Sequence, residues 1–341
     1  MTTCAAAPTT APQFAPDFNS SELASLQQQV ANGDFAGLRQ FLVRAQQACD
    51  WQDEYFVLDL IAPFIKPGSL DPICAAEPNA ADLCLVRGAH LVNLATKSRG
   101  TKTADRTSER QIAQAGEYIK AAISSLGRKS QLSPGDPTPH VFAMRCFQVF
   151  SDLHKNLHKA YQAAIQVAPD FVPAHFVMVN AQSQKWGGSD EQSLRVARAA
   201  MSHAQPGSDA PACVFLAHIL VWQHAVLFEK HHKRADAYAA AGKVTQELKD
   251  AFDRWTRPPY AVRRSSVPYL HHPAYWYYQT GDRANLQQAL ARTAGRPWDK
   301  AWSFAGDPGK TYASALQFAS NGTKSDPAQP SKKGGLLDWF K

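Results

Sequence analysis

The sequence has few of the features that are typical of exported or membrane proteins. Its six cysteines include no Cys-x-x-Cys pair, which argues against a zinc ribbon and against a disulfide framework. Three prolines interrupt the first 16 residues, where a secretory signal needs an unbroken apolar core. The longest apolar segment, around residues 214 to 228, contains His218, Gln223 and His224 and falls short of the roughly 18 to 20 apolar residues that cross a bilayer. We therefore expect a cytoplasmic protein without a membrane span and a buried helix in this segment.

Signatures of catalysis and metal binding are lacking as well. The sequence has no Gly-x-Ser-x-Gly elbow, no cysteine in a recognisable catalytic context and no paired carboxylates on one helix face. His154 and His158 stand at the i, i+4 spacing of a metal pair, but Lys155 occupies the place where a metalloprotease helix has glutamate, and no third ligand is apparent. We expect no catalytic residue, no bound metal and no cofactor.

Strand signals are nearly absent, whereas helical spacing is found throughout the chain. Between residues 21 and 47, apolar residues recur at steps of three and four and are interrupted once, at Asn32, Gly33 and Asp34. This pattern predicts two short helices joined by a tight turn. We expect Gly33 to take the positive φ that ends the first helix and Asp34 to accept the first free amides of the second.

A second Gly-Asp turn between two apolar helical patterns occurs at residues 280 to 282. This recurrence predicts that helix pairs repeat along the chain. Pro78, Pro134, Pro169 and Pro206 each close one helical run and precede another, and the last two intervals are close to the repeat of about 34 residues that is typical of tetratricopeptide helix pairs. We expect an all-α fold, a tetratricopeptide-like α-solenoid of about five to seven helix pairs.

The two ends of the chain differ from this helical body. Residues 1–18 are rich in Pro, Thr and Ala and are expected to be disordered, residues 19–319 to form the helical-repeat domain, and residues 320–341 to form a flexible linker with a short apolar tail. The tail is either a docking peptide for a partner or a cap on the last helix pair. Its apolar residues are Leu336, Leu337, Trp339 and Phe340.

Two central segments carry a resemblance to a known family. Arg87 to Val92 begins with Arg-Gly-Ala-His, and residues 185 to 189 read Lys-Trp-Gly-Gly-Ser. With these segments, roughly residues 77 to 222 resemble a bacterial family of tetratricopeptide-like proteins classed as a domain of unknown function. The resemblance implies a bacterial, cytoplasmic helical-repeat protein and no particular activity. Candidates for a binding surface on the concave wall of such a fold are Arg87, His90, Arg99, His175, Lys185 and Trp186.

His90, His175 and Trp186 also have a structural interpretation. His90 and His175 can be satisfied core histidines. In the Lys-Trp-Gly-Gly-Ser segment, Gly187 and Gly188 can supply a left-handed turn, and Ser189 can cap the next helix. Trp186 would then lie beneath the turn.

The region around residues 254 to 278 interleaves basic and aromatic residues. Such a mixture can stack single-stranded bases or hold an acidic peptide, but the aromatic rings can equally pack the last repeats while the arginines are solvated. We take six residues as candidates: Arg254, Arg257, Arg263, Arg264, Tyr275 and Trp276.

These observations favour a non-enzymatic interaction module that binds a peptide or protein partner on a concave helical surface. A net charge of +7 allows an alternative, a nucleic-acid-associated factor that uses the basic and aromatic region. A second alternative is an enzyme or metal protein built on His90, His154, His158 or His175.

Overall fold

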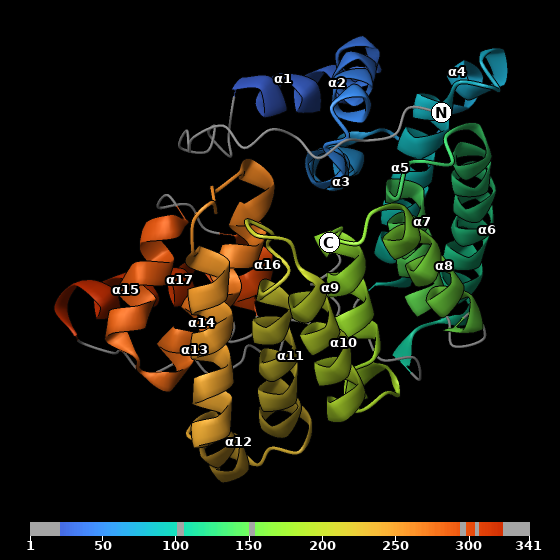
Figure 1. Ribbon diagram of the computed structural model, residues 1–341. Coiled ribbons are helices and arrows are strands. Elements are labelled where there is room, and N and C mark those ends of the chain that lie inside the picture. Colours follow the sequence, from blue (N-terminus) through green and yellow to red (C-terminus); the bar gives the residue numbers. More distant parts are fainter. Residues whose placement is uncertain (1–20, 101–105, 150–153, 294–297, 304–306, 323–341) are drawn as a thin grey trace. The chain divides into compact units, whose positions relative to one another are not determined.

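The computed structural model describes residues 21–100, 106–149, 154–293, 298–303 and 307–322 (Figure 1). Within these ranges every regular element is a helix and there is no strand, as the spacing of the apolar residues predicts. None of the helices in the described ranges is both long and apolar enough to cross a bilayer. The chain divides into two compact units, and the boundary falls between Val177 and Met178.

The first unit is built from helices that pack against their neighbours in the sequence. The longest two, α5 and α6, pack against each other, α7 contacts both, and α8 contacts α7. Gly88 on α5 lets α6 approach closely, because a Cβ atom there would lie 2.5 Å from Leu126 Cδ2. The elements are α1 (Ser21–Ala31), α2 (Ala36–Gln47), α3 (Trp51–Ile61), η1 (Ala62–Phe64), α4 (Asp71–Ala76), α5 (Ala81–Arg99), α6 (Glu109–Leu132), α7 (Thr138–Val149) and α8 (His154–Val167), and α9 (Val172–Ala181) spans the boundary.

The second unit is organised around α11, which contacts α10, α12, α13 and α14. All but one of the α11 residues are buried, which confirms the buried helix expected in this segment. A helix that is apolar on every side is found inside a protein core. The elements are η4 (Gln184–Trp186), α10 (Asp190–His203), α11 (Ala212–Gln223), η5 (His224–Phe228), α12 (His232–Ala239), α13 (Gly242–Thr256), η6 (Arg264–Ser266), α14 (Val267–Thr280), α15 (Arg283–Arg292), α16 (Asp299–Trp302) and α17 (Pro308–Asn321).

The turns predicted from the sequence are present. Gly33 has a φ of 83° between α1 and α2, and Asp34 Oδ1 accepts a hydrogen bond from the Ala36 amide at 2.9 Å. Gly281 adopts the left-handed conformation after α14, and Asp282 caps α15 through the Asn285 amide at 3.1 Å. The four prolines of the repeat pattern all lie between helices.

The Lys-Trp-Gly-Gly-Ser segment forms a helix exit followed by a helix entry. Gly187 is left-handed, as expected, whereas Gly188 is needed for a different reason: a Cβ atom there would lie 2.1 Å from the Gln182 carbonyl oxygen. Ser189 Oγ accepts a hydrogen bond from the Gln192 amide at 3.2 Å and so caps α10. The cap places Asp190 at the first position of that helix.

Candidate functional site

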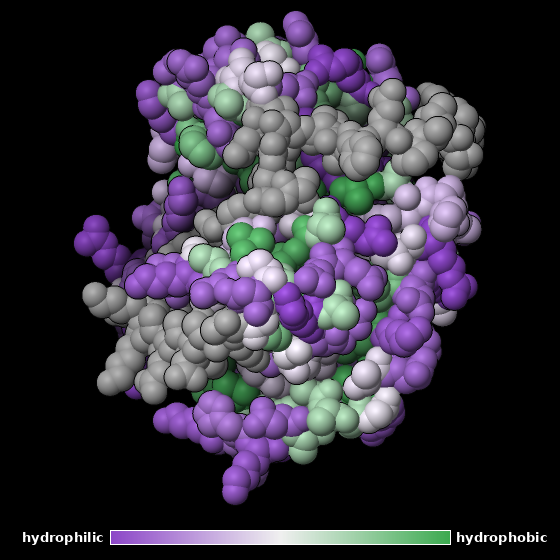
Figure 2. All heavy atoms as spheres, turned by 90° about the vertical axis from the view of Figure 1, so that its left-hand side faces the viewer, coloured by the Kyte–Doolittle hydropathy of each residue, from purple (hydrophilic) through white to green (hydrophobic). Residues whose placement is uncertain are grey.

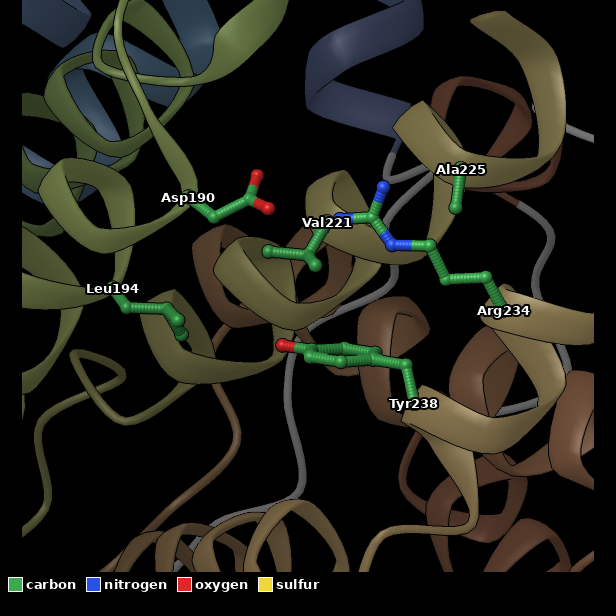
Figure 3. A pocket seen from close by; sticks show the side chains of 6 residues that line it. All are labelled: Asp190, Leu194, Val221, Ala225, Arg234 and Tyr238. Atoms are coloured by element: carbon green, nitrogen blue, oxygen red, sulfur yellow. The ribbon is translucent and has the colours of Figure 1, made fainter. Parts of the chain in front are cut away.

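A small pocket in the second unit lies between α10, α11, η5 and α12 (Figure 3). Its volume is about 120 Å³. Asp190 and Arg234 extend from opposite sides of the pocket, and the phenolic oxygen of Tyr238 points toward the side of Leu194 (Figure 3). The lining residues are Asp190 and Leu194 of α10, Val221 of α11, Ala225 of η5, and Arg234 and Tyr238 of α12.

The local backbone explains why these side chains converge. At the end of α11 the chain continues as a π-helix, η5. This wider helix is rare and is frequently found at functional sites. The following helix α12 is capped by His231, whose Nδ1 accepts a hydrogen bond from the Arg234 amide at 3.2 Å. Arg234 and Tyr238 stand four residues apart on α12 and therefore share one face.

Behind the pocket, Tyr238 of α12 begins a chain of hydrogen bonds that joins four helices. Its hydroxyl oxygen lies 2.6 Å from Nδ1 of His218 on α11. Nε2 of His218 lies 3.2 Å from a carboxylate oxygen of Glu247 on α13. Arg198 of α10 donates two hydrogen bonds to the same carboxylate, at 2.6 and 2.8 Å. We call this chain, Tyr238, His218, Glu247 and Arg198, the tyrosine relay.

The charges of the tyrosine relay are balanced internally. Hydrogen bonds from Arg198 and then from His218 lower the pKa of Glu247 to about 2, so its carboxylate is ionised at neutral pH. Burial, followed by the negative charges of Asp190 and Glu247, raises the pKa of the Tyr238 phenol. The phenol therefore stays protonated, which makes it a hydrogen-bonding group and not a nucleophile.

The two charged residues at the pocket differ in their partners. Nη1 of Arg234 lies 2.5 Å from a carboxylate oxygen of Glu229, so the charge of Arg234 is already compensated. Asp190 makes no ion pair within 4 Å in the part of the chain that the structure describes. The uncompensated charge at this pocket is therefore negative.

The binding-surface candidates of the first unit are held by structural contacts. Arg87 bridges Asp71, at 3.1 Å, and Ser125, at 2.8 Å. His90 is buried, its Nδ1 lies 3.2 Å from the Ala62 carbonyl oxygen, and burial lowers its pKa. Arg99 is half-buried, and its guanidinium donates to the Gly100 carbonyl at 3.3 Å.

His175 also has the structural interpretation that the sequence left open. It is buried, its Nδ1 lies 3.0 Å from the Tyr161 hydroxyl, and its Nε2 lies 2.8 Å from the Pro169 carbonyl oxygen. In the second unit Lys185 and Trp186 are half-buried next to each other, with the ammonium 5.3 Å from the centre of the indole ring. Neither of these two residues lines the pocket.

The basic and aromatic region does not form the mixed surface that would stack nucleotide bases. Tyr275 and Trp276 are only 1% and 4% exposed, and Arg264 is also buried. We correct the interpretation of these three residues as a binding surface, because η6 is buried and α14 is buried from Val267 to Tyr278. Arg254, Arg257 and Arg263 are exposed, as the solvated-arginine alternative expects.

The aromatic residues at the start of this region serve a buried carboxylate. Asp209 accepts hydrogen bonds from Trp255 Nε1 at 2.9 Å, from the Tyr260 hydroxyl at 2.8 Å and from Ser266 Oγ at 2.7 Å. A buried carboxylate satisfied by three donors is a structural element. The region therefore holds the end of α13 and the start of α14 in place.

No group of three metal-ligating side chains occurs in the described part of the chain. His158 is exposed on α8, and the side chain of His154 lies outside the described residues. The docking-tail residues Leu336, Leu337, Trp339 and Phe340 also lie outside them.

Comparison of the chain with protein-family models, with curated proteins and with solved structures gives no match. The resemblance to a tetratricopeptide-like family therefore stays a prediction.

Sequence reasoning did not find the pocket or the tyrosine relay. One signal was available, because His218 stands within a strongly apolar helix, α11, and a buried imidazole needs hydrogen-bond partners. The identity of those partners depends on how α11, α12 and α13 pack. Local spacing in the sequence does not contain that information.

Proposed function

We propose that this protein is a non-enzymatic interaction module that binds a segment of a peptide or protein partner, and that the pocket of the second unit receives one side chain of that segment. The observation that carries the proposal is the size of the pocket, about 120 Å³. Sites for small-molecule ligands and cofactors usually measure roughly 300 to 1,000 Å³. A single amino-acid side chain is what a pocket of the observed size accommodates.

The exposed surface also favours recognition at one point over a broad apolar groove. Hydrophilic residues cover most of the face shown in Figure 2, and apolar residues lie between them in small groups. The large exposed apolar side chains among the described residues are scattered over four helical elements and the end of η1. A peptide held on such a surface needs a side chain inserted into a pocket as its anchor.

The proposal includes a tetratricopeptide-like α-solenoid of about five to seven helix pairs. The successive packing of α5, α6, α7 and α8 supports this arrangement in the first unit. The central position of α11 among four helices differs from simple stacking of pairs. A bacterial origin and a cytoplasmic location also belong to the proposal, as the family resemblance implies.

A peptide selection tests this function. Random peptides displayed on phage are selected on the full chain, and the enriched peptides are titrated against the protein and against Leu194→Trp. The larger indole side chain should fill the pocket and weaken binding at least about tenfold, which corresponds to 1.4 kcal/mol. Ala199→Trp, an exposed position on the same helix, is the matched control and should leave binding unchanged.

The selection can also refute the proposal. If no peptide is enriched, or if Leu194→Trp and Ala199→Trp bind the enriched peptides equally well, this pocket does not bind a partner segment.

A further inference from the structure

When the imidazole of His218 is neutral, the tyrosine relay sets which way the hydroxyl proton of Tyr238 points. A carboxylate can only accept hydrogen bonds, so with a neutral imidazole the Nε2 atom of His218 carries the proton that is shared with Glu247. Nδ1 of the same ring is then an acceptor, and the Tyr238 hydroxyl donates to it at 2.6 Å. With a neutral imidazole, the phenol donates its only proton inside the protein.

The remaining lone pair of the phenolic oxygen is what the pocket presents to a ligand. Tyr238 lines the pocket, as does the carboxylate of Asp190, which is also an acceptor. Both oxygens therefore favour a ligand group that donates hydrogen bonds.

The charge balance points in the same direction. The pocket and its immediate partners contain the carboxylates of Asp190 and Glu229 and the guanidinium of Arg234. Since Glu229 pairs with Arg234, the negative charge of Asp190 has no positive partner at the pocket. A binding site for an anion would instead require Arg234 to be free.

The walls of the pocket indicate what kind of chain the donor group of the ligand is attached to. Leu194, Val221 and Ala225 provide apolar side chains from three elements. A chain of methylene groups fits against them, as the stem of a long amphipathic side chain does on other apolar surfaces.

We propose that the pocket binds the side chain of a lysine residue in the partner segment. The methylene groups lie against the apolar walls, and the ammonium group donates hydrogen bonds to Asp190 and to the phenolic oxygen of Tyr238. This inference rests on the proposed function, because it names the side chain that the peptide segment brings to the pocket.

Three capped peptides test the inference directly. They have the form acetyl-Gly-Gly-Xaa-Gly-Gly-amide, where Xaa is lysine, norleucine or glutamate, and their binding to the full chain is measured by saturation-transfer NMR titration. Lysine and norleucine share the apolar stem, so their affinity ratio isolates the ammonium group. We expect the lysine peptide to bind about tenfold more tightly than the norleucine peptide, as a charge-assisted hydrogen bond allows, and the glutamate peptide to bind most weakly.

Two variants with matched controls locate the preference. Asp190→Asn should lower the ratio of lysine to norleucine affinity about fivefold, while Glu191→Gln, which removes an exposed negative charge one residue further along α10, should leave it unchanged. Tyr238→Phe removes the phenolic acceptor and should also lower the ratio, while Tyr277→Phe, elsewhere in the second unit, should not.

The outcomes separate this inference from the proposed function. If all three peptides bind equally well and Leu194→Trp abolishes their binding, the pocket accepts side chains without a preference for lysine, and only the inference fails. If the lysine preference is present but survives Asp190→Asn, the assignment of the ammonium site is wrong. If none of the three peptides binds, the inference is overturned, and the peptide selection with Leu194→Trp and Ala199→Trp decides separately on the proposed function.

Discussion

Glu54 should make the stability of the first unit depend on pH in an unusual direction. Its side chain is fully buried on α3, where it accepts hydrogen bonds from Thr138 Oγ1 at 2.7 Å and from Gln46 Nε2 at 2.8 Å. An ion pair between Lys129 and Asp136, at 2.9 Å, is also buried in this unit. Burial, and then the negative charge of Asp136, raises the pKa of Glu54 from 4.5 to about 8.

The sign of the effect follows from counting protons. Between pH 4.5 and 8 the folded state keeps the proton on Glu54 and the unfolded state has lost it, so the free energy of unfolding falls as the pH rises. One proton gives a slope of about 1.4 kcal/mol per pH unit. Between pH 6 and pH 8 this amounts to about 2 to 3 kcal/mol, because the slope flattens as the pH approaches the pKa of the folded state.

Urea unfolding at pH 6, 7 and 8, followed by circular dichroism, measures this contribution. Glu54→Gln keeps the shape and the acceptor oxygen of the side chain but does not titrate, so its stability relative to the unsubstituted protein should increase by about 2 kcal/mol from pH 6 to pH 8. Glu117→Gln, an exposed position on α6, is the control and should follow the unsubstituted protein at every pH. A constant difference between Glu54→Gln and the unsubstituted protein across this range would refute the reasoning.

Two further substitutions test the packing inside each unit. Asp209→Ala should lower the free energy of unfolding by about 3 kcal/mol or more, because three buried donors lose their acceptor; Asp253→Ala, on the half-exposed side of α13, should cost well under 1 kcal/mol in the same urea assay. Gly88→Ala should lower it by about 1 to 3 kcal/mol, because the new methyl group overlaps Leu126. Gly116→Ala on α6 is its control, since nothing lies near the added Cβ atom there and the better helix propensity should make it neutral or stabilising. Equal stabilities of the two glycine variants would show that α5 and α6 are not in close contact at Gly88.

The sequence predicted the helices and their turns because both depend on neighbouring residues. Gly33 and Gly281 end their helices as expected, and the prolines of the repeat pattern all fall between helices. The division at Val177 was not predicted, because nothing in the local composition of α9 marks a boundary between compact units.

The aromatic region shows why the predicted surface was wrong at Tyr275 and Trp276. A cluster of aromatic residues near arginines is typical both of a nucleic-acid surface and of a core next to a solvated edge. In α14 the four residues from Tyr275 to Tyr278 are all aromatic and follow one another directly, so their side chains cover every side of the helix and not a single face. Such a helix has to be buried all round, and the run of consecutive aromatic residues already indicates this burial in the sequence.

The candidate site could not be predicted because its parts come from separate helices. His218, Tyr238 and Glu247 are ordinary residues in their own segments, and only the packing of α11, α12 and α13 brings them together. No local pattern marks them as a unit.

Three carboxylates of this protein differ in how their charge is satisfied, and the difference identifies the pocket. Asp209 is buried and receives three hydrogen bonds. Glu54 is buried and is uncharged at neutral pH, because its raised pKa keeps the carboxyl group protonated. Asp190 has neither solution, since it is half-buried at the start of α10 and has no ion-pair partner among the described residues. A carboxylate that lines a pocket and has no ion-pair partner among the described residues is available to form charge-assisted hydrogen bonds with a cationic group of a partner. The free carboxylate of Asp190 is therefore the feature around which a partner's ammonium group should be sought.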